Sequence, residues 1–406
     1  MINKHRGRFV IVILDGFGVG EMPDVEKVRP ADIGANTCLH IFEKTPGLYL
    51  PALQELGLVN IMGFLPGKMR PSQSAKFGKA MLKHFGADTF FGHQEIMGTF
   101  PREVRCEMFC EIIDDAESVL LKNGYSVRRF AAGGNELLIV DDCVTVADNI
   151  ECDPGQAINV TAAIDDIDFK KVLEIGELVR SVTIAPRVIA FGGRSVHLPD
   201  LLGAVEVHGS LIGVNAPASG VYNKDYHCIH MGDGVDAKVQ APTILGRAGL
   251  PVFLLGKVAD VVSNEFGVSI PMVDTKAVLH ETATLINENP FGFFCVNVQE
   301  TDLCGHRENI SEYVKTLEAA DRGVSEIMGA IGENDILIVM ADHGNDPTIG
   351  HPHHTREMVP LMIRSSPEGL VNIGIRNSLA DVAATACSFF GASPPESGES
   401  FLDLII

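Results

Sequence analysis

The sequence predicts an α/β protein in which helices cover a mainly parallel sheet and a second, α+β domain is inserted into the chain. The first observation is a set of short apolar runs at 9–14, 251–255, 293–298 and 335–340. Runs that are apolar at successive positions are typical of strands buried on both faces of a parallel sheet. The second observation is that the apolar runs are shorter, and Gly and Pro more common, in the middle of the chain.

The elements follow from these runs in chain order. Phe9 to Leu14 predicts a central strand that ends at Asp15. Between the runs at 293–298 and 335–340, apolar residues recur with helical spacing, and Asn309 with Glu312 is typical of a capping box at the helix start. Strand, helix and strand together predict a βαβ unit.

The middle of the chain predicts a separate domain. From about residue 100 the apolar runs become shorter, Gly and Pro are common, and acidic pairs interrupt the pattern. One helix is expected to begin near Asp168. We therefore expect a core domain formed by residues 1–99 and 230–406, and an inserted α+β domain formed by residues 100–229.

Composition limits the partners of the chain. The 406 residues carry a formal net charge of −21, which argues against binding nucleic acid or an anionic membrane surface. No apolar run approaches the ~18 residues of a membrane span. The nine cysteines lack CxxC spacing, as expected for reduced thiols, so a cytoplasmic location is predicted. Composition leaves the oligomeric state open.

Metal-ligating side chains follow three of the four apolar runs. Because ligands bind outside the carboxyl ends of parallel strands, these side chains are expected at one edge of the sheet. Carboxylate and imidazole together suit Zn²⁺, Mn²⁺ or Fe²⁺, and so many ligands suit two divalent ions, an arrangement used for phosphoryl transfer. Taken singly, each residue is as well explained as a turn or cap residue. The candidates are Asp15, Asp302, His306, Asp342, His343, His351, His353 and His354.

Four segments resemble the phosphopentomutase family of the alkaline phosphatase superfamily. They are residues 14–20 (LDGFGVG), 88–98 (DTFFGHQEIMG), 341–348 (ADHGNDPT) and 354–360 (HTREMVP). The resemblance covers both core segments. It implies an alkaline phosphatase-like core with an inserted cap domain that selects a small phosphorylated substrate.

The resemblance also implies roles for individual residues. Thr89 would accept the phosphoryl group beside the first metal ion. A sugar bisphosphate activator is also implied. Mn²⁺ is the expected ion, although the ligand types also suit Zn²⁺ or Mg²⁺. The implied ligand sets are Asp15, Asp342 and His343 for the first ion, with Thr89 beside it, and Asp302, His306 and His354 for the second.

The chain also departs from the family pattern. Ala87 stands where the family has Lys before its Asp-Thr, and Gln94 replaces a Trp. Asp302 lies one residue nearer to its histidine than in the family. The inserted domain shows little of the family's substrate motifs. Only Asp153 and Arg194 are retained as candidate substrate-binding residues, since Arg commonly recognises phosphate.

These features predict an isomerase that moves a phosphoryl group between the 1- and 5-positions of ribose or deoxyribose, or of a related sugar, through phosphothreonine. One alternative is a metal-dependent phosphatase or a phosphodiester or phosphonate hydrolase of the same superfamily. Another is a metal-binding module without turnover. A cofactor-independent phosphoglycerate mutase shares the predicted fold, but no segment resembles that family's nucleophilic serine.

Overall fold

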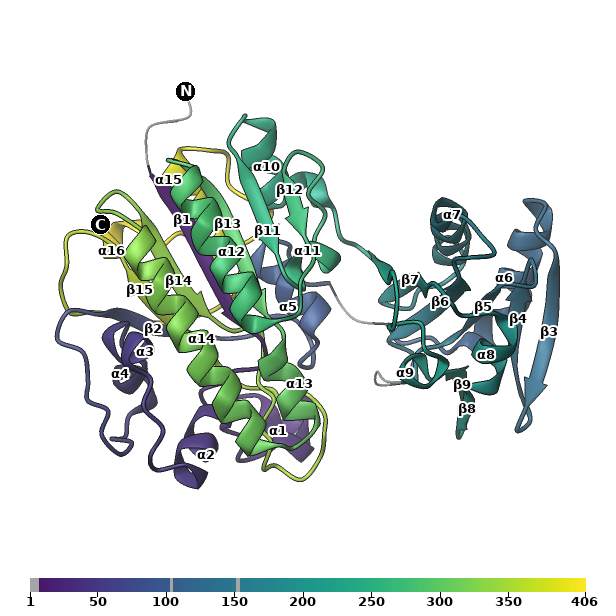
Figure 1. Ribbon diagram of the computed structural model, residues 1–406, viewed down its shortest axis with the longest axis horizontal. Helices are drawn as coiled ribbons and strands as arrows, with labels where there is room; N and C mark the ends of the chain where they lie inside the picture. The colour runs from purple at the N-terminus through teal and green to yellow at the C-terminus, as the bar shows by residue number, and fades with distance from the viewer. Residues whose placement is uncertain (1–6, 103–104, 151–153) are drawn as a thin grey trace. The chain divides into compact units, whose positions relative to one another are not determined.

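The computed structural model describes residues 7–102, 105–150 and 154–406, which form two compact units (Figure 1). The core unit comprises Met1–Arg102 and Asp236–Ile406. The inserted unit comprises Glu103–Val235. The chain therefore leaves the core unit once and returns to it.

The core unit is built on an eight-stranded sheet of order β12-β11-β13-β1-β14-β15-β2-β16. Its central strand β1 (Arg8–Leu14) is parallel to β13 (Gly292–Val298) on one side and to β14 (Ile336–Met340) on the other. Strand β11 (Val252–Leu255) continues the parallel part. These strands are almost completely buried, as their uninterrupted apolar runs predict, and the predicted fold class is confirmed.

The other end of the sheet is mixed. Strand β15 (Val359–Arg364) runs antiparallel to both β14 and β2 (Lys76–Ala80). The edge strands are β16 (Val371–Arg376), parallel to β2, and β12 (Val268–Ile270), parallel to β11. A buried apolar run does not reveal strand direction, which is why the sequence predicted only the parallel half.

Helices pack on the core sheet. The long helices α12 (Thr275–Glu288) and α14 (Ile310–Ala330) lie side by side over it (Figure 1). Asn309 caps α14 by accepting a hydrogen bond from the Glu312 amide. The other helices of the core unit are α1 (Val25–Val28), α2 (Thr37–Lys44), α3 (Pro51–Glu55), α4 (Leu58–Met62), α5 (Thr89–Ile96), α10 (Ala241–Arg247), α11 (Val258–Val261), α13 (Glu300–His306), α15 (Asp381–Phe390) and α16 (Leu402–Ile405).

The inserted unit is an α+β domain with a six-stranded sheet of order β10-β7-β6-β5-β4-β3. Most neighbours are antiparallel, but β6 (Ala157–Ala163) and β7 (Arg187–Gly193) are parallel and are joined by α7 (Phe169–Arg180), which Asp168 caps. The remaining elements are β3 (Val127–Ala132), β4 (Asn135–Val140), β5 (Val144–Asp148), β8 (Val205–His208), β9 (Leu211–Val214), β10 (His227–Gly232), α6 (Phe109–Lys122), α8 (Leu198–Gly203) and α9 (Ala216–Ser219).

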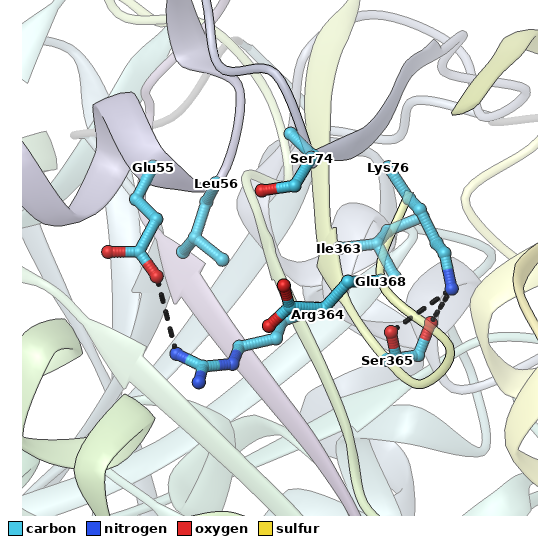
Figure 2. Close-up of a pocket in the computed structure, with 9 residues that line it drawn as sticks. Glu55, Leu56, Ser74, Lys76, Ile363, Arg364, Ser365 and Glu368 are labelled. Carbon is cyan, nitrogen blue, oxygen red and sulfur yellow. Dashed lines mark hydrogen bonds and ion pairs between the residues drawn. The ribbon is translucent and has the colours of Figure 1, made fainter. Parts of the chain in front are cut away.

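A small pocket lies beside β2 and β15 in the core unit (Figure 2). Its buried Lys76 ammonium donates hydrogen bonds to the hydroxyl of Ser365 and to the carbonyl oxygens of Ser365 and Ile405, which ties the C-terminal helix α16 to the sheet. The pocket holds about 30 Å³, room for about one water molecule. It is therefore too small for a sugar phosphate.

No helix in the described part of the chain has the length and apolar composition needed to cross a membrane. Every cysteine that the structure describes is a free thiol.

Candidate metal centre

The three parallel strands β13, β1 and β14 bring the sequence-predicted ligands to one edge of the core sheet. Asp15 follows β1, while Asp342 and His343 follow β14. Asp302 lies on α13, the short helix that begins two residues after β13. All four side chains are buried. Their proximity follows from strand order, because the carboxyl ends of parallel neighbours meet at the same edge.

A first cluster surrounds His343. Its Nε2 atom lies 3.4 Å from Asp15 Oδ1 and 3.3 Å from Asp342 Oδ2. The hydroxyl of Thr89, the first residue of α5, donates a hydrogen bond of 2.8 Å to the same Asp342 Oδ2. Gly92 allows this close approach, since a Cβ at that position would lie 2.9 Å from the Asp342 carbonyl oxygen.

A second cluster surrounds Asp302. Its Oδ2 atom lies 3.4 Å from His306 Nε2, and its Oδ1 atom lies 3.3 Å from His354 Nε2. The two imidazole nitrogens are 3.0 Å apart. The other nitrogen of each ring contacts a backbone carbonyl oxygen. His306 Nδ1 lies 2.6 Å from the Pro352 oxygen, and His354 Nδ1 lies 2.8 Å from the Ala87 oxygen. These contacts orient both Nε2 atoms toward Asp302.

The donor atoms of the two clusters fit divalent ions. Asp15 Oδ1 and His343 Nε2 are buried, and neither has a hydrogen-bond partner among the described residues. Buried polar atoms are normally paired, so two open atoms of ligand type 3.4 Å apart indicate a place for a cation. Among the described residues, two groups have ligand atoms within 4.8 Å of one another: Asp15, Asp342 and His343 in one, and Asp302, His343 and His354 in the other.

Neighbouring charges control the protonation of these residues. Burial alone would lower the pKa of His343, but the Asp342 and Asp15 carboxylates raise that pKa to about 10. Burial would raise the pKa of Asp302, but Lys257 and the two histidines around it lower that pKa well below its ordinary value. The Asp302 carboxylate is therefore ionised at neutral pH, and a cation bound at His343 would displace the proton from its Nε2 atom.

Sequence reasoning missed Lys257, which lies between the two clusters. Its ammonium is 3.0 Å from Asp15 Oδ2 and 3.5 Å from Asp302 Oδ2. The pKa of Lys257 reflects two opposing effects, since burial lowers it and the two carboxylates raise it, with a net rise. The residue follows β11 directly after Gly256, so the rule that identified Asp15 also applies to it.

The segment before Thr89 is held by Arg356. This buried guanidinium donates hydrogen bonds to the carbonyl oxygens of Leu82 at 3.2 Å, His84 at 2.9 Å and Gly86 at 2.5 Å. It also donates two hydrogen bonds of 2.8 Å to the Asp24 carboxylate. Arg356 thus connects the segment that leads into α5 with the segment that carries His354.

The two substrate candidates lie outside these clusters. Arg194 belongs to the inserted unit, where its guanidinium lies 2.8 Å from Asp165 Oδ1 and 2.9 Å from Asp225 Oδ2. It lines an open pocket of about 410 Å³ at the carboxyl ends of β6 and β7, together with Asp165, Phe169 and His227. Asp153 falls outside the described residues.

Comparison with known proteins agrees with a metal-dependent site. The Metalloenzyme superfamily matches residues 7–394, so the chain belongs to that superfamily and binds divalent metal. Within it, the chain is 31% identical over 412 residues to the phosphopentomutase of Caldanaerobacter subterraneus subsp. tengcongensis, with 97% of each chain covered. It is also 31% identical over 414 residues to the phosphopentomutase of Alkaliphilus oremlandii, with 98% of this chain and 99% of that protein covered. The chain is a phosphopentomutase-like enzyme of the isomerase type.

Proposed function

We propose that this enzyme interconverts the 1- and 5-phosphates of ribose or deoxyribose through a phosphothreonine at Thr89. The observation that carries the proposal is the position of the Thr89 hydroxyl, 2.8 Å from Asp342 Oδ2 and beside the cluster with open ligand atoms. A hydroxyl needs such surroundings to act as a nucleophile at neutral pH. The pentose is proposed because both relatives described above are phosphopentomutases.

The proposed reaction has two transfers. Phosphothreonine first gives its phosphoryl group to the free hydroxyl of a bound sugar phosphate, and the proton of that hydroxyl passes to the departing Thr89 oxygen. The restored Thr89 hydroxyl then attacks the other phosphate of the sugar, the bond from phosphorus to the sugar oxygen breaks, and the Thr89 proton passes by way of its hydrogen bond to Asp342 to the departing sugar oxygen. Thr89 is also at the N-terminus of α5, where the helix dipole stabilises negative charge.

Asp15, Asp342 and His343 would hold one ion beside Thr89, and Asp302, His306 and His354 would hold the other. Bound divalent ions would lower the pKa of the nucleophilic hydroxyl and stabilise charge on the transferring oxygens. We propose Mn²⁺ as the native ion, which imidazole and carboxylate ligands accommodate.

Asp153 and Arg194 are proposed to contribute to substrate binding. Arg194 would have to exchange one of its two carboxylate partners for a phosphate, which a planar guanidinium can bind in the same bidentate way. A sugar bisphosphate is the proposed activator, because it would phosphorylate Thr89 and start the cycle.

The test combines activity with intact mass. The Mn²⁺-loaded protein is incubated with ribose 5-phosphate and a sugar bisphosphate, and both isomerisation and free phosphate are followed. We expect isomerisation, little free phosphate and a mass increase of one phosphoryl group. Thr89→Ala should abolish all three signals, whereas Thr284→Ala, which removes a hydroxyl on α12, should retain them. Full turnover by the Thr89 variant contradicts the phosphothreonine, and release of phosphate as the main product contradicts the mutase.

A further inference from the structure

We propose that Asn297 holds His93 as the neutral imidazole with its proton on Nδ1, so that the histidine nearest Thr89 is a hydrogen-bond donor and not the base. His93 and Asn297 would then be positioning residues for Thr89 and Asp342. The protonation pattern stands on geometry alone, whereas its importance for turnover rests on the function proposed above.

Asn297 connects two parts of the site. It is the second-last residue of β13, an otherwise apolar strand, and its side chain is buried. Its Nδ2 atom lies 2.9 Å from Asp15 Oδ2 and 2.9 Å from His93 Nε2. A side-chain amide nitrogen carries two hydrogens, so it can serve both acceptors at once.

The Asp15 carboxylate determines which way the Asn297 amide faces. An ionised carboxylate can only accept hydrogen bonds. If the amide were rotated by half a turn, its Oδ1 would face both Asp15 Oδ2 and the ring of His93, and two buried oxygens would be in contact without a proton. The nitrogen must therefore face Asp15, and the same nitrogen then faces His93 Nε2.

The Asn297 amide in turn determines where the His93 proton is. Because Asn297 Nδ2 donates to His93 Nε2, that ring nitrogen must be an acceptor without a hydrogen. The remaining hydrogen is then on Nδ1. Nδ1 faces two acceptors, the Thr89 carbonyl oxygen at 2.8 Å and Asp342 Oδ2 at 3.2 Å, and both require a donor there. The two sides of the ring lead to the same tautomer.

This tautomer excludes His93 as the proton acceptor for Thr89. The Thr89 hydroxyl oxygen lies 3.4 Å from His93 Nδ1, a nitrogen that already carries a hydrogen, and 2.8 Å from Asp342 Oδ2. His93 lies on α5 one turn after Thr89. Its Nδ1–H therefore fixes the position of the first turn of α5 relative to the Asp342 carboxylate. Hydrogen bonds thus run from Asp15 through Asn297 and His93 to Thr89, whose hydroxyl in turn donates to Asp342.

The tautomer can be measured directly by nitrogen NMR of the folded, histidine-labelled protein loaded with Mg²⁺, which is diamagnetic. The two ring nitrogens of His93 are assigned by their loss in His93→Asn. We expect a hydrogen on Nδ1 and none on Nε2. A hydrogen on Nε2, with or without one on Nδ1, overturns the proposal. Asn297→Asp places an acceptor opposite Nε2 and should move a hydrogen onto that nitrogen.

Two substitutions of His93 test the consequence for turnover. The Asn side-chain nitrogen can take the place of Nδ1, whereas the Gln side-chain nitrogen takes the place of Nε2. His93→Asn should keep most of kcat, and His93→Gln should lower kcat by about 10–100-fold with little change in KM. Equal activities, or a better Gln variant, contradict the positioning role. Metal content and melting temperature are compared in both variants, so that loss of the fold is recognised. If Thr89→Ala remains active, the function proposed above fails while the tautomer result stands.

Discussion

Charged residues are arranged in opposite ways at the carboxyl edge of the core sheet and on the inserted unit. At the core edge, Asp15, Asp342 and His343 are buried, and two of their ligand-type atoms have no hydrogen-bond partner among the described residues. On the inserted unit, Arg129 lies near Asp114, Glu117 and Glu136, and all four side chains are exposed to solvent to some degree.

The difference shows which charges indicate function. Burying a charge or a polar atom without a partner is costly, so a protein retains such atoms where a ligand completes them. Exposed ion pairs form readily between surface residues and contribute little free energy. The unpaired buried atoms at the core edge therefore indicate a ligand, whereas exposed charges of the inserted unit such as Arg129 and its three carboxylates are explained by their mutual attraction.

The largest expected effect is the loss of a ligand at the core edge. Asp342→Asn should lower kcat/KM for phosphoryl transfer by about 10³-fold, equivalent to about 4 kcal/mol, because Asp342 contacts both His343 and Thr89. Asp165→Asn, which changes an exposed carboxylate of the inserted unit, should leave the metal content unchanged. Asp342→Asn should also bind less metal than the wild type, and equal metal contents in the two variants would contradict a functional difference between the two regions.

The next effect compares two arginines by stability. Arg356→Ala removes hydrogen bonds to three carbonyl oxygens and to Asp24, and should lower the free energy of unfolding by about 3 kcal/mol. Arg129→Ala removes three surface pairs and should cost less than about 1 kcal/mol. Denaturant unfolding at neutral pH gives both values. Similar losses of unfolding free energy in the two variants would contradict the claim that the buried arginine contributes more to stability than the exposed one.

A smaller effect concerns acid stability. Burial would raise the pKa of Glu95, but hydrogen bonds from His84 and Ser378 lower it. A lowered pKa in the folded state contributes stability that is present above about pH 4.3, the ordinary Glu pKa, and is lost as the pH falls through the folded-state pKa. Glu95→Gln should be less stable at pH 7 and should lose less stability on acidification, by up to about 1.4 kcal/mol per pH unit.

Unfolding experiments between pH 3 and pH 7 check this. Asp165 provides the matched case on the inserted unit, since contacts with Ser195 and Arg194 lower its pKa at an exposed position. Asp165→Asn should change the pH dependence less, and added salt should reduce the change further. Parallel pH curves for wild type and Glu95→Gln would contradict the account of the buried carboxylate.

Uninterrupted apolar runs were sufficient to predict much of the core. The apolar runs that became β1, β13 and β14 were visible, and so were the polar residues that follow them. The sequence did not indicate that β15 is antiparallel to β14. Strand direction depends on the path of the connecting segment and not on the composition of the strand. Helix α7 begins one residue after Asp168, the residue where sequence reasoning expected its start.

Residues at the site were found or missed for physical reasons. Asp15 and Asp342 stand out because ionisable residues are rare beside buried strands. Lys257 follows a strand that the sequence did reveal, but its side chain is not a metal-ligand type and was passed over, whereas Asn297 lies inside a strand and not in a terminal turn. The signal for Asn297 was its polarity within an otherwise apolar run. Contacts such as those of Arg356 depend on tertiary packing and leave no local pattern.

The most direct test of the central claim is the number of metal ions that each chain binds. Protein freed of metal, loaded with Mn²⁺ and passed through a desalting column is analysed by mass spectrometry, with Asp302→Asn beside wild type. We predict two ions per wild-type chain and one per variant chain, because Asp302 lies between His306 and His354 in the second cluster only. One ion or none in the wild type, or two in the variant, would contradict the two-metal site at the carboxyl edge of the sheet.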